Sequence, residues 1–259
     1  MSAKPNLRIP IITLTSDFGL SDSYVAAMKA AILHRMPGAA LIDVTHQIPP
    51  QDVLAGSFAL ERAIDACSAG TVHLAVIDPG VGGRRRILVV RIRGQYVVCP
   101  DNGLITWPWR RLGTARAFKL TWRPRHSSQT FHGRDIMAPA AAMLAGGRPV
   151  HEIAAAIDDP ILLNIHPARR PARAGRIIYI DHFGNATTNI PHASLPTRAS
   201  IVVAGKKLGK IRKTYGDVSP GHFLALIGSA DLLEIAVRDG SAAASLGLRV
   251  GDPVRIDRD

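Results

Sequence analysis

The sequence predicts an α/β protein in two parts: an N-terminal, mainly parallel sheet with helices on both faces, and a smaller C-terminal β-barrel domain. Strand and helix patterns alternate through the first two-thirds of the chain, which is typical of a parallel sheet covered by helices. The segment HPARRPARAG, residues 166–175, is rich in Pro and Arg and has no periodicity, as expected of a linker. Short strands separated by turns follow it. We therefore expect domains at 1–165 and 176–259.

Apolar spacing predicts each element of the first part in order. Runs of apolar and β-branched residues predict strands, and apolar residues at helical spacing predict helices. Ser21 fits the N-cap of the first helix. In chain order the predictions are a strand at Ile9–Thr15, a helix at Asp22–Met36, a strand at Ala40–Val44, a helix at Val53–Ala66, a strand at Thr71–Ile77, a hairpin of Ile87–Arg93 and Gln95–Cys99 around Gly94, and helices at 133–147 and 150–157.

The second part contains short apolar runs that predict strands. They are Arg176–Asp181, Ala199–Ala204, Phe223–Ile227, Leu232–Val237 and Pro253–Ile256. Short strands separated by turns in this way favour a small barrel. No internal repeat is visible.

Size and composition are those of an ordinary globular protein. The chain has 259 residues, of which 47% are hydrophobic, enough for a sizeable core. No apolar run approaches the ~20 residues that cross a bilayer, and the N-terminus is predicted as a first strand rather than a signal peptide. Cys67 and Cys99 lack metal or redox spacing and suit a reducing compartment, so we expect a cytoplasmic protein without membrane contact.

The formal net charge of +12 raises the question of a nucleic-acid partner. The arginines occur in short clusters, and aromatic residues make up only 5% of the chain, so stacking platforms for single strands are scarce. The composition favours a solvated basic surface over nucleic-acid binding.

Two acidic residues follow predicted strands at the sheet edge where α/β proteins bind ligands. Asp17 follows the first strand in TLTSDFGLSD, and Asp78 follows another in VIDPGVGGRRR. Both favour a site over a turn-stabilising role. Asp22 fits a helix cap as well as a site. The glycines after Asp78 lack the spacing of phosphate-binding loops, and a strand rather than a helix follows them.

Two further stretches contain candidate residues. In TFHGRDIMAPAAA, His132 precedes a predicted helix and can be structural or catalytic, while Gly133 would let a substrate approach closely. In YIDHFGNATTNI, Asn185 can pair with an adenine edge or only form the turn. The other histidines are scattered along the chain, so we expect no metal site.

Seven stretches in order resemble one family. They are LTSDFGLSDSYVAAMK, DVTHQIPPQDVLAG, VIDPGVGGRRR, PDNGLIT, TFHGRDIMAPAAA, IDHFGNATTNI and GSADLLEIAV. Together they span nearly the whole chain and resemble the S-adenosylmethionine hydroxide adenosyltransferases, the adenosine-forming S-adenosylmethionine hydrolases, which are relatives of fluorinating and chlorinating adenosyltransferases. The segment TWPWRRLG departs from the family pattern, which leaves the role of the Trp107–Arg111 loop open.

The resemblance implies hydrolysis of S-adenosyl-L-methionine to adenosine and L-methionine by attack of water or hydroxide at C5′, with no cofactor. The family's Asp–Arg–His set falls on Asp78, Arg85 and His132. Asp78 or His132 would accept a proton from water, and the sequence leaves open which one. Arg85 would stabilise developing negative charge and hold Asp78 in place. Its neighbours Arg84 and Arg86 are expected to be surface charge.

The resemblance also separates the hydroxide branch from halide transfer. The halogenating relatives have Tyr at the positions of Asp78 and His132, and the fluorinating ones have Ser at Gly133. Two alternatives remain: a halide-using adenosyltransferase on the same scaffold, and a non-catalytic nucleotide- or RNA-binding protein.

Substrate-binding residues and an assembly are implied in the same way. Asp17 would bind the ribose hydroxyls. Asp22, Asp181 and Ser229 would lie near the methionine part, and the adenosine part would meet Phe183, Asn185, Glu234 and the backbone of Val237. The resemblance further implies a homotrimer, with each site between the first domain of one subunit and the second domain of its neighbour.

Overall fold

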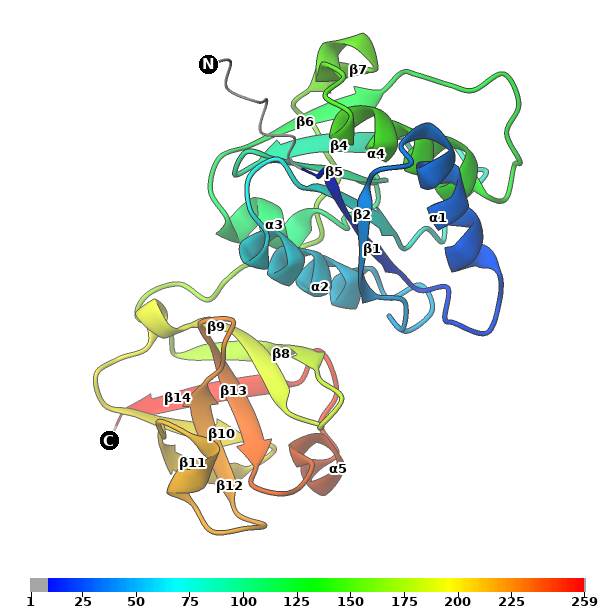
Figure 1. Cartoon of the computed structure of the whole chain (residues 1–259). Coiled ribbons are helices and arrows are strands. Elements are labelled where there is room, and N and C mark those ends of the chain that lie inside the picture. The colour runs from blue at the N-terminus through cyan, green and yellow to red at the C-terminus, as the bar shows by residue number, and fades with distance from the viewer. Residues whose placement is uncertain (1–8, 259) are drawn as a thin grey trace, which may run out of the picture. The chain divides into compact units, whose positions relative to one another are not determined.

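The computed structural model describes residues 9–258, which fall into two compact units, one ending at Ile165 and the other beginning at His166 (Figure 1). The first eight residues, which bear on the signal-peptide prediction, lie outside this range. No helix within it is long and apolar enough to cross a membrane. In the expected linker, Ala168 and Ala172 donate backbone hydrogen bonds to Asn189 and Ser194 of the second unit. The boundaries of 1–165 and 176–259 stay a prediction.

The first unit is built on a seven-stranded sheet with the order β2-β1-β3-β5-β4-β6-β7. Its strands are β1 (Ile11–Ser16), β2 (Ala40–Thr45), β3 (Val72–Val76), β4 (Ile87–Ile92), β5 (Gln95–Pro100), β6 (Ala115–Leu120) and β7 (Ala154–Ile157). The pairs β2–β1, β1–β3 and β3–β5 are parallel, whereas β4, β6 and β7 join antiparallel. The sheet is mixed and largely parallel, and the predicted fold class is confirmed.

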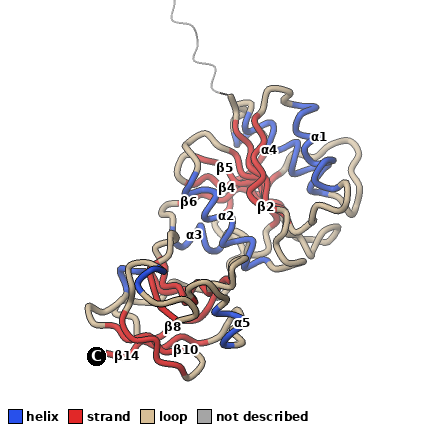
Figure 2. Tube along the Cα trace, turned by 60° about the horizontal axis from the view of Figure 1, so that its bottom comes forward, coloured by secondary structure: helices blue, strands red, loops and turns tan. Residues whose placement is uncertain are grey.

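Helices cover both faces of this sheet. They are α1 (Tyr24–Arg35), α2 (Val53–Ala66), α3 (Thr106–Arg111) and α4 (Ala138–Ala145), the last preceded by a π-helical turn at Gly133–Met137. α1 packs on α4, and α2 packs on α3. Figure 2 shows the strands, in red, between these two helix pairs. The core between the sheet and the α1–α4 pair contains fully buried Ile12 and Met28.

Local patterns predicted several elements well. α2 has the predicted bounds, and the Asp52 side chain caps it by accepting from the Ala55 N–H at 2.9 Å. The hairpin of β4 and β5 is confirmed, and Arg93 and Gly94 at its turn have φ of 48° and 72°. α1 begins later than predicted, with Ser23 rather than Ser21 at its N-cap.

The helix predicted at 150–157 is wrong. Val150–Glu152 forms one 3-10 turn, and Ala154–Ile157 is strand β7. Alanine has the highest intrinsic helix propensity, but tertiary context overrides propensity, and here antiparallel pairing of β7 with β6 at the sheet edge decides the structure.

The second unit is an antiparallel sheet with the order β11-β10-β14-β8-β9-β13-β12. Its strands are β8 (Ala174–Ile180), β9 (Ala186–Pro191), β10 (Ala199–Val203), β11 (Lys206–Lys210), β12 (Phe223–Ile227), β13 (Leu232–Val237) and β14 (Pro253–Arg258). A bridge between Arg212 and Leu226 brings the two edges together, so the barrel is nearly closed. One short helix, α5 (Ala242–Leu246), follows β13.

Candidate functional site

The stretch VIDPGVGGRRR turns the chain back at the end of β3. Val81 N donates to Asp78 O at 3.1 Å, and Gly83 N donates to Gly80 O at 3.0 Å. These turns bring Arg85 against Asp78. Its Nε donates to Oδ1 and Oδ2 at 2.9 and 3.1 Å, and its Nη2 also donates to Oδ2. The side chains are 10% and 5% exposed, so a largely buried ion pair stands at the strand end.

A cavity of about 400 Å³ lies beside this pair, at the carboxyl ends of β1, β2 and β3. It is lined by Asp17, Phe18, Tyr24, Pro50, Gln51, Val76, Asp78, Pro79, Val81 and residues 130–133. The structure thus brings the predicted Asp17, Asp78 and His132 to one cavity, and it places Arg85 on Asp78. Open α/β sheets bind ligands at this edge.

The imidazole ring of His132 is neutral, and one of its two nitrogens makes no hydrogen bond to residues 9–258. Its Nδ1 is buried and has no hydrogen-bond partner among residues 9–258. By contrast, His46 and His73 use both ring nitrogens. Burial lowers the pKa of His132, and the positive charges of Arg85 and then Arg123 lower it further. The ring is therefore uncharged at neutral pH and can accept a proton.

Gly133 stands where the π-helical turn packs closely on its neighbours. A Cβ here would lie 3.2 Å from Val76 Cγ1 and 3.4 Å from Met28 Sδ. The missing side chain lets the π-helical turn pack closely on β3 and α1. Gly133 also lines the cavity, and its role in letting a substrate approach stays a prediction.

Sequence reasoning missed an aromatic wall of the cavity. The ring centroids of Phe18, Tyr24 and Phe131 lie 5.3–5.9 Å apart, in tilted and edge-to-face pairs. Phe18 and Phe131 adjoin Asp17 and His132 in the sequence, and that adjacency was the available signal. The three rings give the cavity an aromatic surface beside its polar groups.

Asp17 is held in place, whereas Asp22 stands apart. Asp17 Oδ2 accepts a hydrogen bond from Gln51 N at 2.8 Å, which links the segment after β1 to the segment between β2 and α2. Asp22 lies in an exposed turn before α1 and does not line the cavity.

In the second unit, Asp181 organises the turn between β8 and β9. Its Oδ1 accepts from the Phe183 and Asn185 N–H groups at 2.9 and 2.8 Å, and its Oδ2 accepts from Asn185 Nδ2 at 3.0 Å. The turn role of Asn185, one of its two alternatives, is therefore present. The Phe183 ring is 73% exposed, so it is available for contact.

Glu234 lies on β13 of the second unit and interacts electrostatically with Asp181. Burial raises its pKa, Asp181 adds to that shift, and the hydrogen bond from Tyr215 opposes it. Tyr215 donates to Glu234 Oε1 at 2.6 Å and was not anticipated from the sequence. Ser229 lies in the turn before β13, and Val237 is the last, buried residue of that strand.

Arg86 is not surface charge. Its Nε donates to Asp101 Oδ2 at 2.6 Å, and its Nη1 donates to Asp159 Oδ1 at 2.7 Å. Asp101 is only 1% exposed, so Arg86 compensates a buried carboxylate. Arg84 is exposed, as expected. Within VIDPGVGGRRR, the three arginines therefore face three different environments.

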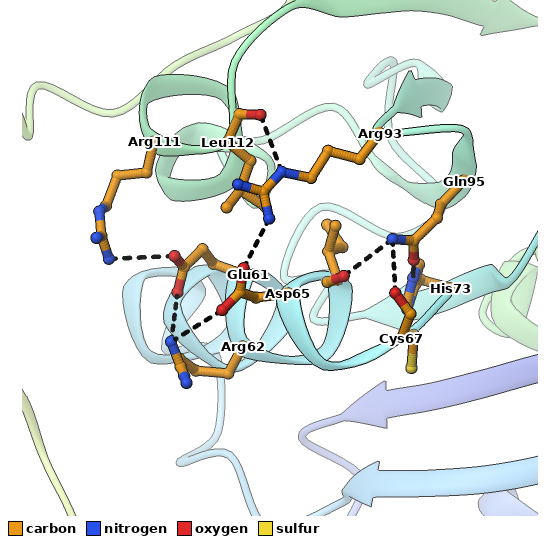
Figure 3. Close-up of polar contacts among 10 residues, drawn as sticks. Glu61, Arg62, Asp65, Cys67, His73, Arg93, Gln95, Arg111 and Leu112 are labelled. Atoms are coloured by element: carbon orange, nitrogen blue, oxygen red, sulfur yellow. Dashed lines mark hydrogen bonds and ion pairs between the residues drawn. The ribbon is translucent and has the colours of Figure 1, made fainter. Parts of the chain in front are cut away.

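The Trp107–Arg111 segment, left open by the sequence, is helix α3 with Trp107 fully buried. Arg111 donates to the buried Glu61 of α2 at 3.1 Å (Figure 3). Arg62, Asp65 and Arg93 extend this network (Figure 3). The segment ties two helices together and does not reach the cavity.

The first unit is an α/β unit with a cavity at the ends of its strands, and the second unit is a β-barrel. The fold therefore places the chain among two-domain α/β proteins with a candidate ligand site in the first domain. Within the described range, no three His, Cys, Asp or Glu side chains gather as metal ligands would. Profiles described as the N-terminal and C-terminal domains of SAM hydroxide adenosyltransferase match residues 12–154 and 175–255. The chain belongs to the S-adenosylmethionine (SAM) hydroxide adenosyltransferase family.

Named relatives match this chain over nearly their full length. A protein of Thermus thermophilus named (R)-S-adenosyl-L-methionine hydrolase is 41% identical, over 93% of this chain and 97% of its own. A protein of Salinispora tropica with the same name is 38% identical, over 95% and 97%. The crystal structure of an uncharacterized conserved protein from Thermotoga maritima matches with a TM-score of 0.88 at 35% identity, over 95% and 100% of the two chains. A fluorinase of Nocardia brasiliensis is more distant, at 26% identity over 97% and 98%.

Proposed function

We propose that this protein hydrolyses S-adenosyl-L-methionine to adenosine and L-methionine. One observation supports this most strongly: the Asp78–Arg85 ion pair and the uncharged His132 line or adjoin one cavity in a chain of this family. The relatives from Thermus thermophilus and Salinispora tropica carry the (R) form of S-adenosyl-L-methionine in their names, so both sulfonium epimers belong in the assay.

The chemistry needs an activated water but no acid. The water oxygen attacks C5′, a C5′–O bond forms, and the C5′–S bond breaks with its electron pair going to sulfur. Methionine leaves as a neutral thioether. The proton lost by the water goes to a protein group, and such general-base assistance contributes about 10²–10⁴-fold to the rate.

We assign the proton acceptor to His132. Both oxygens of Asp78 already accept hydrogen bonds from Arg85, which leaves that carboxylate to orient the water. His132 lines the cavity, and its ring is uncharged at neutral pH, so it can take the proton. Arg85 fixes Asp78 and stabilises hydroxide character as the proton leaves.

Substrate binding draws on residues of both units in this proposal. Asp17 has a second carboxylate oxygen, Oδ1, available for the ribose hydroxyls beside the one that holds Gln51. The methionine ammonium would be met by the anionic Asp22 and Asp181 together with Ser229. The adenosine would be met by Phe183, Asn185, Glu234 and the backbone of Val237.

The test is incubation with S-adenosylmethionine, without halide and with EDTA. Adenosine and methionine should appear in equal amounts. Asp78→Ala and Arg85→Ala should abolish the rate, while Arg84→Ala, the exposed neighbour, serves as a matched control that keeps it. Absence of both products, or an unchanged rate in Asp78→Ala, would overturn the proposal. Activity in EDTA would also support the expectation that no metal or other cofactor takes part.

Halide transfer is the second candidate, because fluorinases are relatives. The Asp78 carboxylate lines the cavity and repels a halide, which argues against it. Adding chloride or fluoride separates the two: 5′-haloadenosine above background would favour transfer. Binding of RNA that weakens steeply with salt would instead favour the non-catalytic alternative.

We also propose a cytoplasmic homotrimer whose active site combines the first domain of one subunit with the second domain of its neighbour. Light scattering measures the mass. Mixing Asp78→Ala subunits with Asp181→Ala subunits tests the shared site, because only a site shared between subunits regains activity on mixing. Cell fractionation tests the compartment.

A further inference from the structure

A buried hydrogen-bond chain runs behind the cavity, from the end of β1 to α1. Ser16 Oγ lies 2.7 Å from His46 Nδ1, and His46 Nε2 lies 3.1 Å from Asp43 Oδ1. Lys29 Nζ donates to Asp43 Oδ2 at 2.6 Å. Ser16 and His46 are 0% and 3% exposed, so the inner half of the chain is sealed from solvent.

The chemistry of the groups fixes two of these directions. The Asp43 carboxylate only accepts, so His46 Nε2 carries a hydrogen and donates to it at 3.1 Å. At the other end, the Ser16 oxygen accepts the Phe18 N–H at 3.4 Å. The hydrogen bond between Ser16 Oγ and His46 Nδ1 joins the two ends, and linked hydrogen bonds of this kind reinforce one another.

The hydrogen-bond chain ends at residues 16–19, a segment that contains two of the residues lining the cavity. Ser16 directly precedes Asp17 and Phe18, both of which line the cavity. The backbone of His46 adds a second tie, because its carbonyl accepts from Gly19 N at 2.7 Å. Residues 16–19 are therefore clamped to the segment after β2, which supplies the Gln51 N–H to Asp17.

Ser16, His46 and Asp43 have the residue types of a hydrolase triad but not its exposure. Ser16 is fully buried and does not line the cavity, so no substrate carbonyl can reach its oxygen. Its hydroxyl instead makes hydrogen bonds that hold residues 16–19 in place.

We propose that Ser16 and His46 are positioning residues that hold Asp17 and Phe18 in the geometry that binds the nucleoside. This inference rests on the proposed function. Because the ribose contact of Asp17 exists in both the ground state and the transition state, its loss acts on KM and leaves kcat nearly unchanged.

The same strand offers a matched control. Thr13 of β1 donates or accepts at 2.7 Å with His73 Nδ1, and His73 Nε2 lies 2.6 Å from Gln95 Oε1. Figure 3 shows His73 beside Gln95, whose amide donates to the carbonyls of Ile64 and Cys67. Thr13 is as buried as Ser16, at 1%, but it does not line the cavity and has no bond to the 16–19 segment.

The experiment compares Ser16→Ala with Thr13→Val in the full-length protein. Both remove one buried hydroxyl and should lower Tm alike. Ser16→Ala should raise KM for S-adenosylmethionine, and Kd for adenosine by calorimetry, by about three- to tenfold, the range of one lost hydrogen bond. Thr13→Val should leave both constants unchanged. His46→Gln should behave like Ser16→Ala.

The outcomes separate the two proposals. Equal KM and adenosine Kd in Ser16→Ala and Thr13→Val would overturn the positioning role while leaving hydrolysis intact. A loss of kcat at constant KM in Ser16→Ala would also overturn it. A wild-type protein that releases no adenosine would refute the proposed function itself, and adenosine binding would then still report on Ser16.

Discussion

Replacing Arg86 with alanine should destabilise the first unit without touching the cavity. Arg86 pairs with Asp101, which is 1% exposed, and with Asp159, which is 69% exposed. Removing one member of a buried ion pair costs about 3–5 kcal/mol, because the other charge stays buried. Arg86 is itself 25% exposed, and Asp101 keeps a hydrogen bond from Ile161 N. Solvent screening and that bond lower the expected cost to about 2 kcal/mol.

For a protein of this size, about 2 kcal/mol corresponds to a fall in Tm of roughly 4–8 °C. Scanning calorimetry measures it, with Arg84→Ala as the exposed control that should stay within about 1 °C because surface substitutions cost little. Asp159→Ala should fall in between. Hydrolysis well below the transition should retain the wild-type KM in Arg86→Ala. A Tm of Arg86→Ala equal to that of Arg84→Ala would refute this account of the pair.

Two more predictions concern the site and the second unit. Arg123 is one of the charges that lower the pKa of His132, so Arg123→Gln raises that pKa. Because the neutral ring is the active form, the acid limb of kcat against pH should then move to higher pH, and an unmoved limb would contradict the assignment. Gly184→Ala should lower Tm more than Gly205→Ala. Both glycines have positive φ, but a Cβ at Gly184 would lie 1.9 Å from Ser241 Oγ, whereas Gly205 has nothing within 4 Å. Equal losses would show that the second unit relieves this clash freely.

Local patterns in the sequence predicted the parts of the fold that depend on nearby residues. Helix α2 and the β4–β5 hairpin follow from spacing and a turn glycine, and both appear with the predicted bounds or within a residue of them. The segment 150–157 failed because its state is decided by β6, a strand some 35 residues earlier that the sequence did not reveal.

The residues of the site also divide into those that local sequence patterns revealed and those whose partners lie far away in the sequence. Asp17, Asp78 and His132 were found from strand ends and motif order, and the cavity unites them. Arg86 was misjudged because its partners Asp101 and Asp159 lie 15 and 73 positions away, beyond any local pattern. The Ser16–His46 contact spans 30 positions and depends on two strands lying side by side, which no local pattern records.

Gly133 has a consequence for the evolution and engineering of such enzymes. A Cβ at this position would lie 3.2 Å from Val76 Cγ1 of β3, which is tight, and 3.4 Å from Met28 Sδ of α1, which is an ordinary contact. A larger residue, such as the Ser implied for fluorinating relatives, therefore asks the Val76 side chain to move by a few tenths of an ångström. Because β3 leads to Asp78 and the turn at Gly133 carries His132, a substitution at Gly133 is coupled to both reactive side chains through Val76. A graft of the reactive side chains alone leaves that contact out, so Val76 belongs among the positions to vary with them.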